Sequence, residues 1–158
     1  MKILMVCLGN ICRSPMAEGI LKGKIRERNL EIEVDSAGTG SWHAGENPDP
    51  RAISTAKKFG IDISGQVARQ FSVYDFDAFD HIFAMDSSNL RDILRLARSK
   101  SDISKVSLIL SYLPEINLKD VPDPWFGSQD GFTEVFNLLD QACDAVIDSL
   151  EKDFLQKD

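Results

Sequence analysis

Apolar residues occur along this chain in short runs that alternate with longer amphipathic segments. Four runs have the length and composition of buried strands: residues 2–7 (KILMVC), 31–37 (EIEVDSA), 81–85 (HIFAM) and 105–110 (KVSLIL). Strands of this kind, separated by helices, predict a parallel sheet that is covered on both faces. The order β-α-β-α-β-α-β-α therefore predicts one open α/β domain over residues 1–158, in which ligands lie beyond the carboxyl ends of the strands.

The amphipathic segments predict four helices. The first begins at Ser14, a candidate cap that precedes Pro15, and its inward face comprises Met16, Ala17, Ile20, Leu21 and Ile25. The second follows Asp49 and Pro50 and stops at Gly60, and its inward residues are Ala52, Ile53, Ala56 and Phe59.

The third predicted helix is capped by Asp86 and runs to about Ser99. The last helix has the clearest apolar stripe at helical spacing, formed by Phe132, Val135, Phe136, Leu139, Ala142, Cys143, Val146, Ile147, Leu150 and Phe154. On such a stripe, Cys143 is interpreted as a small buried hydrophobic residue.

Composition narrows the class of protein. The chain has 158 residues, 43% of them hydrophobic and 27% charged, and a formal net charge of −7. An acidic chain of this kind is not expected to bind nucleic acid or anionic membranes, because both need a basic face. Three cysteines do not form a secreted disulfide framework, and the amino terminus is too short and lacks the pattern of a signal peptide. We expect a cytoplasmic protein with reduced thiols, and a monomer.

Two of the cysteines lie in one loop, "VCLGNICRSPMAEG" (residues 6–19), which joins the first strand to the first helix. A zinc site needs four ligands, and this Cys-x4-Cys pair has no histidine near it. A structural disulfide would leave the adjacent Arg13 without a purpose. The third interpretation, an activated thiolate that attacks an anion, gives every residue of the loop a role.

On this interpretation, the backbone N–H groups of the loop (Leu8, Gly9, Asn10, Ile11 and Cys12) form an anion-binding nest. The helix that follows adds its dipole, and Arg13 offers a planar fork that matches two phosphate oxygens. The same features stabilise a thiolate at Cys7, and the Ser14 hydroxyl is placed to donate to the sulfur. A tight loop favours positive φ at Gly9 and Asn10.

Hydrolysis of a phosphate monoester also needs an acid for the leaving oxygen, because the uncatalysed reaction is extremely slow. The best candidate is Asp123, in the proline-rich loop "KDVPDPWFGSQDGF" (residues 119–132) after the fourth strand. That loop can reach the carboxyl edge of the sheet. The competing interpretation is that Asp-Pro is ordinary turn chemistry.

Several segments resemble one family. The loop "CLGNICRS" (7–14) followed by proline is similar to the phosphate-binding loop of low-molecular-weight protein tyrosine phosphatases. "DSAGTGSWHAGENPDPRA" (35–52), "AMDSSNLRD" (84–92) and "DPWFG" (123–127) agree with it in order and spacing. The resemblance covers essentially the whole chain. It implies a four-stranded parallel sheet with flanking helices, no metal and no other cofactor.

The resemblance also implies a role for each matching residue. Cys7 would be the nucleophile that forms a cysteinyl-phosphate, Arg13 would bind the phosphoryl oxygens, and Ser14 would stabilise the thiolate. Asp123 would protonate the leaving phenolate and then activate water. Asn10 and Ser36 would belong to the hydrogen-bond network that holds the loop. The expected partners are tyrosine-phosphorylated proteins, with phosphate and other oxyanions as inhibitors.

The sequence departs from the family after the acid, where many members carry tyrosines and this chain has Trp125 and Phe126. Aromatic packing against a substrate ring is retained, but phosphorylation at these positions is not possible. Trp42 is expected to line another wall of the cleft. No catalytic role is assigned to His43 or His81.

Cys12 is a candidate redox partner. A Cys7–Cys12 disulfide would protect Cys7 from over-oxidation if the loop brings the two α-carbons close enough, and the family's adjacent cysteine supports this. The competing interpretation is a thiol that only packs the loop.

Two other functions share the expected fold. Thioredoxin-coupled arsenate reductases also have a Cys-x5-Arg loop, but they need further cysteines downstream, and residues 78–95 contain none. A phosphocysteine carrier or phosphoprotein-binding module would have to keep its phosphocysteine from water, whereas an arginine cradle with an acid/base favours turnover.

Overall fold

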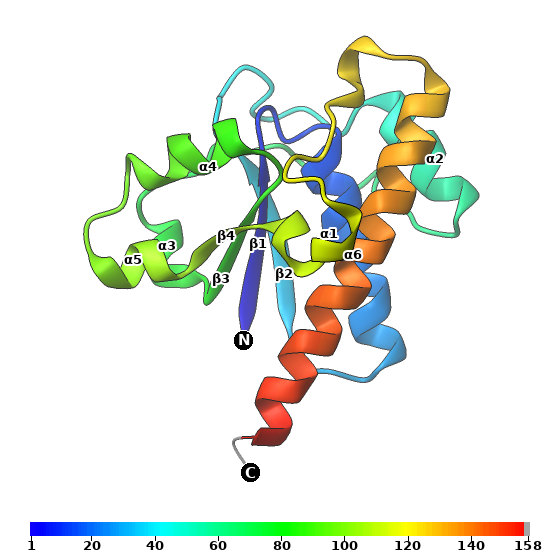
Figure 1. The fold of residues 1–158 in the computed structure, drawn as a ribbon. Coiled ribbons are helices and arrows are strands. Elements are labelled where there is room, and N and C mark those ends of the chain that lie inside the picture. Colours follow the sequence, from blue (N-terminus) through cyan, green and yellow to red (C-terminus); the bar gives the residue numbers. More distant parts are fainter. Residues whose placement is uncertain (157–158) are drawn as a thin grey trace.

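A four-stranded parallel sheet forms the centre of the molecule (Figure 1). The structure is a computed structural model and describes residues 1–156. The strand order is β2–β1–β3–β4, and the strands are β1 (Lys2–Cys7), β2 (Glu33–Gly38), β3 (His81–Ala84) and β4 (Val106–Leu108). From Ile3 onward β1 is buried, as its uninterrupted apolar run requires of a strand covered on both faces.

Helices cover both faces of the sheet. They are α1 (Arg13–Glu27), α2 (Pro50–Lys58), α3 (Asp75–Ala78), α4 (Ser87–Leu94), α5 (Lys100–Ser104) and α6 (Gln129–Gln156). In Figure 1, α1, α2 and α6 lie on one side of the sheet and α3, α4 and α5 on the other. Each side has its own cluster of buried apolar side chains. The predicted three-layer α/β fold is therefore confirmed.

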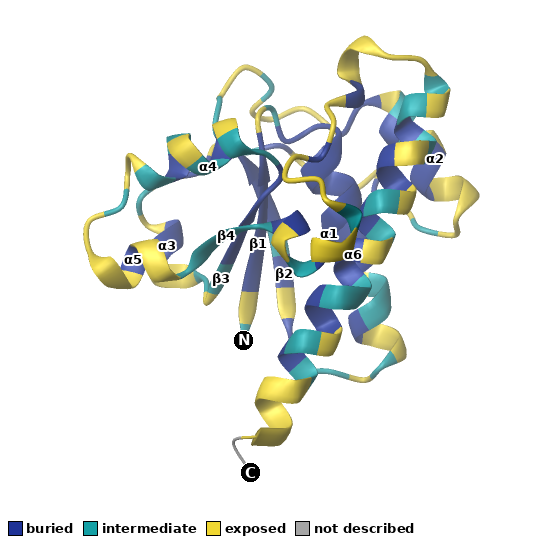
Figure 2. Ribbon diagram, viewed as in Figure 1, coloured by how far each residue is buried: buried dark blue, intermediate teal, exposed yellow. Residues whose placement is uncertain are grey.

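The apolar stripe of α6 packs mainly on α1. Its members from Phe132 to Leu150 are buried, Cys143 among them. Phe154 is different, because the last turns of α6 extend past the body of the protein and are exposed (Figure 2). The prediction that Phe154 faces inward is wrong, since periodicity gives the direction of a side chain but not the place where its partners end.

The single helix expected from Asp86 to Ser99 is two helices. Asp86 caps α4 by accepting the N–H of Asn89 (2.7 Å), as predicted. The chain then leaves helical geometry after Leu94, and Ser99 accepts the N–H of Asp102 (3.2 Å) to cap α5. An extended capping residue cannot also continue the preceding helix, so the prediction of one helix to Ser99 is wrong.

Several element ends also differ from expectation. β2 begins at Glu33, two residues later than predicted, and β3 ends one residue earlier. β4 ends at Leu108, and the buried Ile109 and Leu110 lie in a 3-10 helix, η1 (Ile109–Tyr112). Phe59 directly follows α2 and is half exposed, although its ring stacks on Phe136 with centroids 4.3 Å apart. An apolar run marks burial, but it does not distinguish a strand from a short helix.

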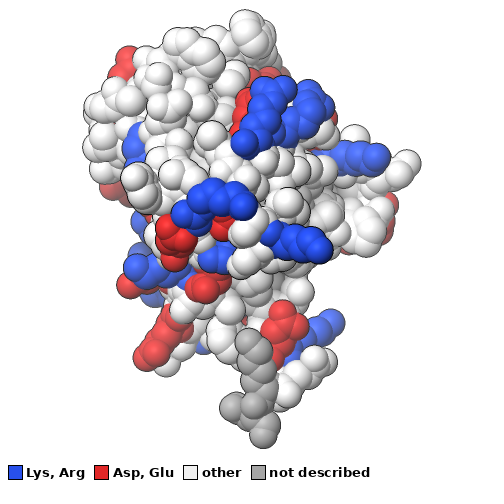
Figure 3. Space-filling model, turned by 90° about the vertical axis from the view of Figure 1, so that its left-hand side faces the viewer, with Lys and Arg blue, Asp and Glu red and all other residues white. Residues whose placement is uncertain are grey.

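The charged side chains are interspersed on the face that carries α3, α4 and α5. Figure 3 shows Lys and Arg next to Asp and Glu over this face, without a continuous basic area in that view. Arg98, for example, contacts both Asp77 (2.6 Å) and Asp102 (2.9 Å). Within residues 1–156, every helix is too short or too polar to cross a membrane.

The packing of α6 makes a prediction about stability. Leu139→Ala removes a fully buried side chain, and we expect it to lower the free energy of unfolding by about 2–5 kcal/mol. Leu155→Ala is the matched control on the same helix, because Leu155 is 78% exposed; its effect should stay within about 0.5 kcal/mol. Urea unfolding followed by circular dichroism measures both, and equal losses would contradict the assignment of the buried face.

Candidate active site

The loop after β1 lies at the carboxyl edge of the sheet and leads directly into α1. Residues 8–12 form the loop, and Arg13 is the first residue of α1. The capping position is Cys12, whose side chain makes no capping hydrogen bond, and Ser14 is already the second residue of the helix. The prediction that Ser14 caps α1 is therefore wrong. The free N–H groups at the start of the helix remain available to an anion.

A chain of side-chain hydrogen bonds begins at the Cys7 sulfur and continues into the protein interior. The Cys7 Sγ lies 3.0 Å from the Ser14 Oγ. Asn10 Nδ2 donates both to Ser14 Oγ (2.8 Å) and to Ser36 Oγ (2.9 Å). The Asn10 Oδ1 accepts the N–H of Arg69 (3.1 Å), which fixes the orientation of the amide. Because Ser14 already accepts from Asn10, its one hydrogen is free to donate to the sulfur.

The chain of hydrogen bonds continues to a buried acid that sequence reasoning missed. Ser36 Oγ donates to Glu18 Oε1 (2.7 Å), and Lys22 Nζ donates to the other oxygen (2.7 Å). Glu18 is only 3% exposed, so these two hydrogen bonds offset the cost of burying its polar side chain. The available signal was spacing, because Ser14, Glu18 and Lys22 follow one another at i, i+4 on one face of a helix.

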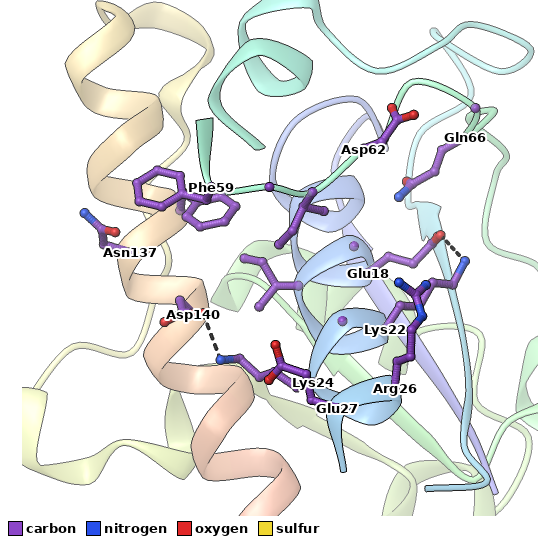
Figure 4. A pocket seen from close by; sticks show the side chains of 17 residues that line it. Glu18, Lys22, Lys24, Arg26, Glu27, Phe59, Asp62, Gln66, Asn137 and Asp140 are labelled. Atoms are coloured by element: carbon purple, nitrogen blue, oxygen red, sulfur yellow. Dashed lines mark hydrogen bonds and ion pairs between the residues drawn. The ribbon is translucent and has the colours of Figure 1, made fainter. Parts of the chain in front are cut away.

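Glu18 also borders a groove of about 850 Å³, which runs along α1 between α6 and residues 59–66 (Figure 4). Two ion pairs lie there, Glu18 with Lys22 and Lys24 with Asp140. Cys7 does not line this groove. We therefore place the candidate active site in the smaller cavity described below, which is lined by a thiol, a guanidinium and a carboxyl group.

The geometry of the loop depends on three positions. Asn10 has φ 58°, a left-handed conformation that asparagine tolerates. Gly9 does not have positive φ, contrary to expectation; a β-carbon there would instead lie 3.0 Å from the ring of His43. At the end of β2, a β-carbon on Gly38 would lie 2.8 Å from the carbonyl oxygen of Leu8. The loop therefore packs directly against the backbone of the neighbouring strand.

Arg13 is buried beside the sulfur and fixed by acceptors from two other segments. Its Nη1 donates to Asp86 Oδ2 (2.7 Å) and to the carbonyl oxygen of Val121 (2.9 Å). Burial lowers the pKa of the guanidinium, but the negative Cys7 and Asp86 more than offset this and raise it. Arg13 therefore stays charged. Asp86, which the sequence identified only as a helix cap, thus has a second contact at the site.

Asp123 lies on the other side of Arg13. Its Oδ2 is 3.8 Å from Arg13 Nη2, and its Oδ1 accepts the N–H of Trp125 (3.0 Å) at the start of the 3-10 helix η3 (Pro124–Phe126). Its side chain is about one third exposed, so a bound molecule can reach it.

A cavity of about 160 Å³ joins these groups. Its lining consists of Cys7, Leu8, Gly9, Ile11, Cys12, Arg13, Trp42, His43, Asp123, Trp125 and Phe126. Asn10, Ser14 and Ser36 support the loop and are absent from this lining. The structure thus brings together the residues singled out in the sequence, and it adds His43, which is hydrogen-bonded to Glu46.

The site presents a buried sulfur beside a fixed guanidinium, with a carboxyl group at the mouth. Such an arrangement can hold a tetrahedral oxyanion against the sulfur. The carboxyl group can then exchange a proton with the oxygen of that anion that points away from the sulfur. Among residues 1–156, no three His, Cys, Asp or Glu side chains are grouped so as to hold a metal ion.

The sequence was then compared with known families and proteins. Residues 2–157 match the profile of the family described as low molecular weight phosphotyrosine protein phosphatase. A protein of that name from Schizosaccharomyces pombe is 46% identical over 138 residues, which cover 85% of this chain and 87% of the relative. A low molecular weight protein-tyrosine-phosphatase of Streptomyces coelicolor is 42% identical, with 89% and 88% covered.

A solved structure agrees with these matches. The crystal structure of a protein tyrosine phosphatase from Entamoeba histolytica, with Hepes in its active site, superimposes with a TM-score of 0.91. The two chains are 38% identical, and the alignment covers 96% of this chain and 97% of the other.

The environment of the other two thiols makes a prediction. Burial, and for Cys12 also the nearby Asp49, raises the pKa of Cys12 and of Cys143 far above the usual value. Because the thiolate is the reactive form, we expect both to resist iodoacetamide from pH 7 to pH 9 in the native protein and to react once it is unfolded. Mass spectrometry of the digested protein locates the label. Native labelling of Cys12 at the rate of a free thiol would contradict the assigned environment.

Proposed function

The chain belongs to the low molecular weight phosphotyrosine protein phosphatase family, and from this premise we propose that Cys7, Arg13 and Asp123 carry out its reaction. The enzyme is a protein tyrosine phosphatase that hydrolyses phosphotyrosine and aryl phosphate monoesters through a cysteinyl-phosphate. The observation that supports this assignment of roles is the shared cavity, in which the sulfur, the guanidinium and the carboxyl group meet.

In the first step, the Cys7 thiolate attacks phosphorus and the bond from phosphorus to the phenolic oxygen breaks. Protonated Asp123 gives its proton to that oxygen, so the leaving group departs as a neutral phenol. Arg13 binds two oxygens of the transferring phosphoryl group, and its bond to Asp86 holds it in place before the substrate arrives. The Ser14 hydroxyl stabilises the sulfur as a thiolate.

In the second step, water attacks phosphorus of the cysteinyl-phosphate. Asp123, now a carboxylate, takes a proton from that water, the bond between sulfur and phosphorus breaks, and phosphate leaves. The Cys7 thiolate is regenerated, so the cycle is complete without a cofactor. Asn10 and Ser36 keep the loop in one geometry through both steps.

The cleft suits a long aromatic ester. Cys7 is only 3% exposed, whereas the aromatic residues at the mouth, Trp42, Trp125 and Phe126, are much more exposed. A tyrosine ring between these residues would carry its phosphate down to the sulfur, and the shorter side chain of phosphoserine would not reach as far. Tyrosine-phosphorylated proteins are therefore the substrate class, and phosphate and other oxyanions are expected to inhibit. The proposal includes a monomer that acts in the cytoplasm, away from nucleic acids and membranes.

Hydrolysis of aryl phosphates tests the assigned roles. Cys7→Ser should lower the turnover of p-nitrophenyl phosphate by more than about a thousandfold. Asp123→Asn should lower kcat/KM for phosphotyrosine by about 10²–10⁴ and for p-nitrophenyl phosphate by less, because nitrophenolate leaves without a proton. Steady-state kinetics measures both.

Three outcomes would overturn the proposal. Full activity in Cys7→Ser would exclude Cys7 as the nucleophile. A stable phosphocysteine without turnover would favour a phosphate carrier. Thiol-dependent reduction of arsenate by the purified protein would favour the reductase.

We also propose that Cys12 protects Cys7 during oxidation. Peroxide oxidises the Cys7 thiolate to a sulfenic acid; the Cys12 sulfur then attacks it, a disulfide forms and water leaves. Both cysteines are free and buried in the structure. Because burial and Asp49 raise the pKa of Cys12, this closure should be faster at pH 9 than at pH 7.

Recovery after oxidation tests this role. Mild peroxide followed by dithiothreitol should restore activity in the native protein, and recovery should be lower in Cys12→Ser, where Cys7 proceeds to irreversible oxidation states. Activity before and after reduction, with mass spectrometry of Cys7, provides the measurement. Equal recovery in the two proteins would exclude protection by Cys12.

A further inference from the structure

The segment that carries Asp123 has little packing of its own. Between residues 117 and 128, only Val121 and Pro124 are buried, and Phe126 is 90% exposed. On the side before Asp123, the segment is held by hydrogen bonds from Val121 N–H to the Met85 carbonyl (2.8 Å) and from Arg13 to the Val121 carbonyl. The side after Asp123 needs a separate support if the carboxyl group is to keep one position.

Arg51 provides contacts on that side. Its Nη1 donates to the carbonyl oxygen of Gly127 (3.4 Å), and its guanidinium lies over the ring of Trp125, 5.4 Å from the centroid. The same group lies 4.7 Å from the centroid of Phe132, at the start of α6. One planar cation therefore contacts the residues that follow Asp123 and the helix into which they lead.

Arg51 is itself fixed by Asp49, which also contacts the phosphate-binding loop. Arg51 Nε and Nη2 donate to the two oxygens of Asp49, at 3.1 and 3.0 Å. The backbone N–H of Asp49 donates to the carbonyl oxygen of Ile11 (2.8 Å). The amino terminus of α2 thus links the loop of Cys7 to the segment of Asp123.

We propose that Arg51 is a positioning residue for the general acid, holding the segment of Asp123 at a fixed place relative to the phosphate-binding loop. The proposal rests on the role of Asp123 proposed above. Lysine would keep the charge, but its single nitrogen could not donate to both oxygens of Asp49 and to the carbonyl of Gly127 at once. It also has no planar group to lie over the ring of Trp125. Arg51→Lys therefore tests the geometry of the side chain and leaves its charge in place.

The readout is kcat/KM for aryl phosphates whose leaving groups differ in acidity, because this constant reports the step in which the phenol departs. We expect Arg51→Lys to lower kcat/KM for phenyl phosphate and phosphotyrosine by about tenfold. The loss for 2,4-dinitrophenyl phosphate should be less than about twofold, because that leaving group needs no proton. Inhibition by inorganic phosphate should be unchanged, since the phosphate-binding loop is intact.

Arg95→Lys is the matched control, because Arg95 is an exposed arginine whose ion-pair partner within residues 1–156 is Asp92 in α4, and neither residue lines the cavity of the site. It should leave all substrates unaffected. In an Asp123→Asn background, Arg51→Lys should cause little further loss, because Arg51 acts through the acid.

The outcomes separate the two proposals. If Asp123→Asn shows no dependence on the leaving group, the role of the acid fails. If Asp123→Asn does show that dependence, three results for Arg51→Lys would overturn its positioning role. These are an equal loss of activity on all substrates, no loss on any substrate, and a weakening of phosphate inhibition in proportion to the loss of activity. Arg51→Gln serves as the second variant if Arg51→Lys does not fold, and the same comparisons apply to it.

Discussion

The side-chain amide of Asn10 is the constraint on which the rest of the site depends. It donates to Ser14 and to Ser36 and accepts the N–H of Arg69. These bonds hold a backbone with positive φ and leave the Ser14 hydrogen for Cys7. A buried amide that donates both hydrogens and accepts a third bond has one stable orientation. The loop is therefore preorganised before any phosphate binds.

The charges of the site are balanced across three chain segments. Arg13 follows β1, Asp86 follows β3 and Asp123 follows β4, and in a parallel sheet these ends meet at one edge. Arg13 is buried, so it needs anionic partners, and Asp86 provides one without substrate. Asp123 is further away and more exposed, which leaves its carboxyl group available to exchange protons.

Agreement between sequence and structure was best where a residue's role follows from its neighbours in the chain. β1 has the predicted ends, Asp86 caps its helix as expected, and α6 buries the expected stripe as far as Leu150. Errors arose where several local interpretations were equally good. Ser14 could cap a helix or bond to a sulfur, and only the position of Cys7 and Asn10 decides between these uses.

The sequence by itself determined the succession of the four strands and of the helices α1, α2, α4 and α6, the phosphate-binding loop and the candidate chemistry of Cys7, because periodicity and motif spacing are local properties. The tertiary structure alone decided which distant residues support that chemistry. Glu18 reaches Ser36 only because α1 packs on the sheet, and Arg51 contacts Trp125 only because α2 lies beside the start of α6. Such contacts depend on how the elements pack, and spacing along one chain does not encode them.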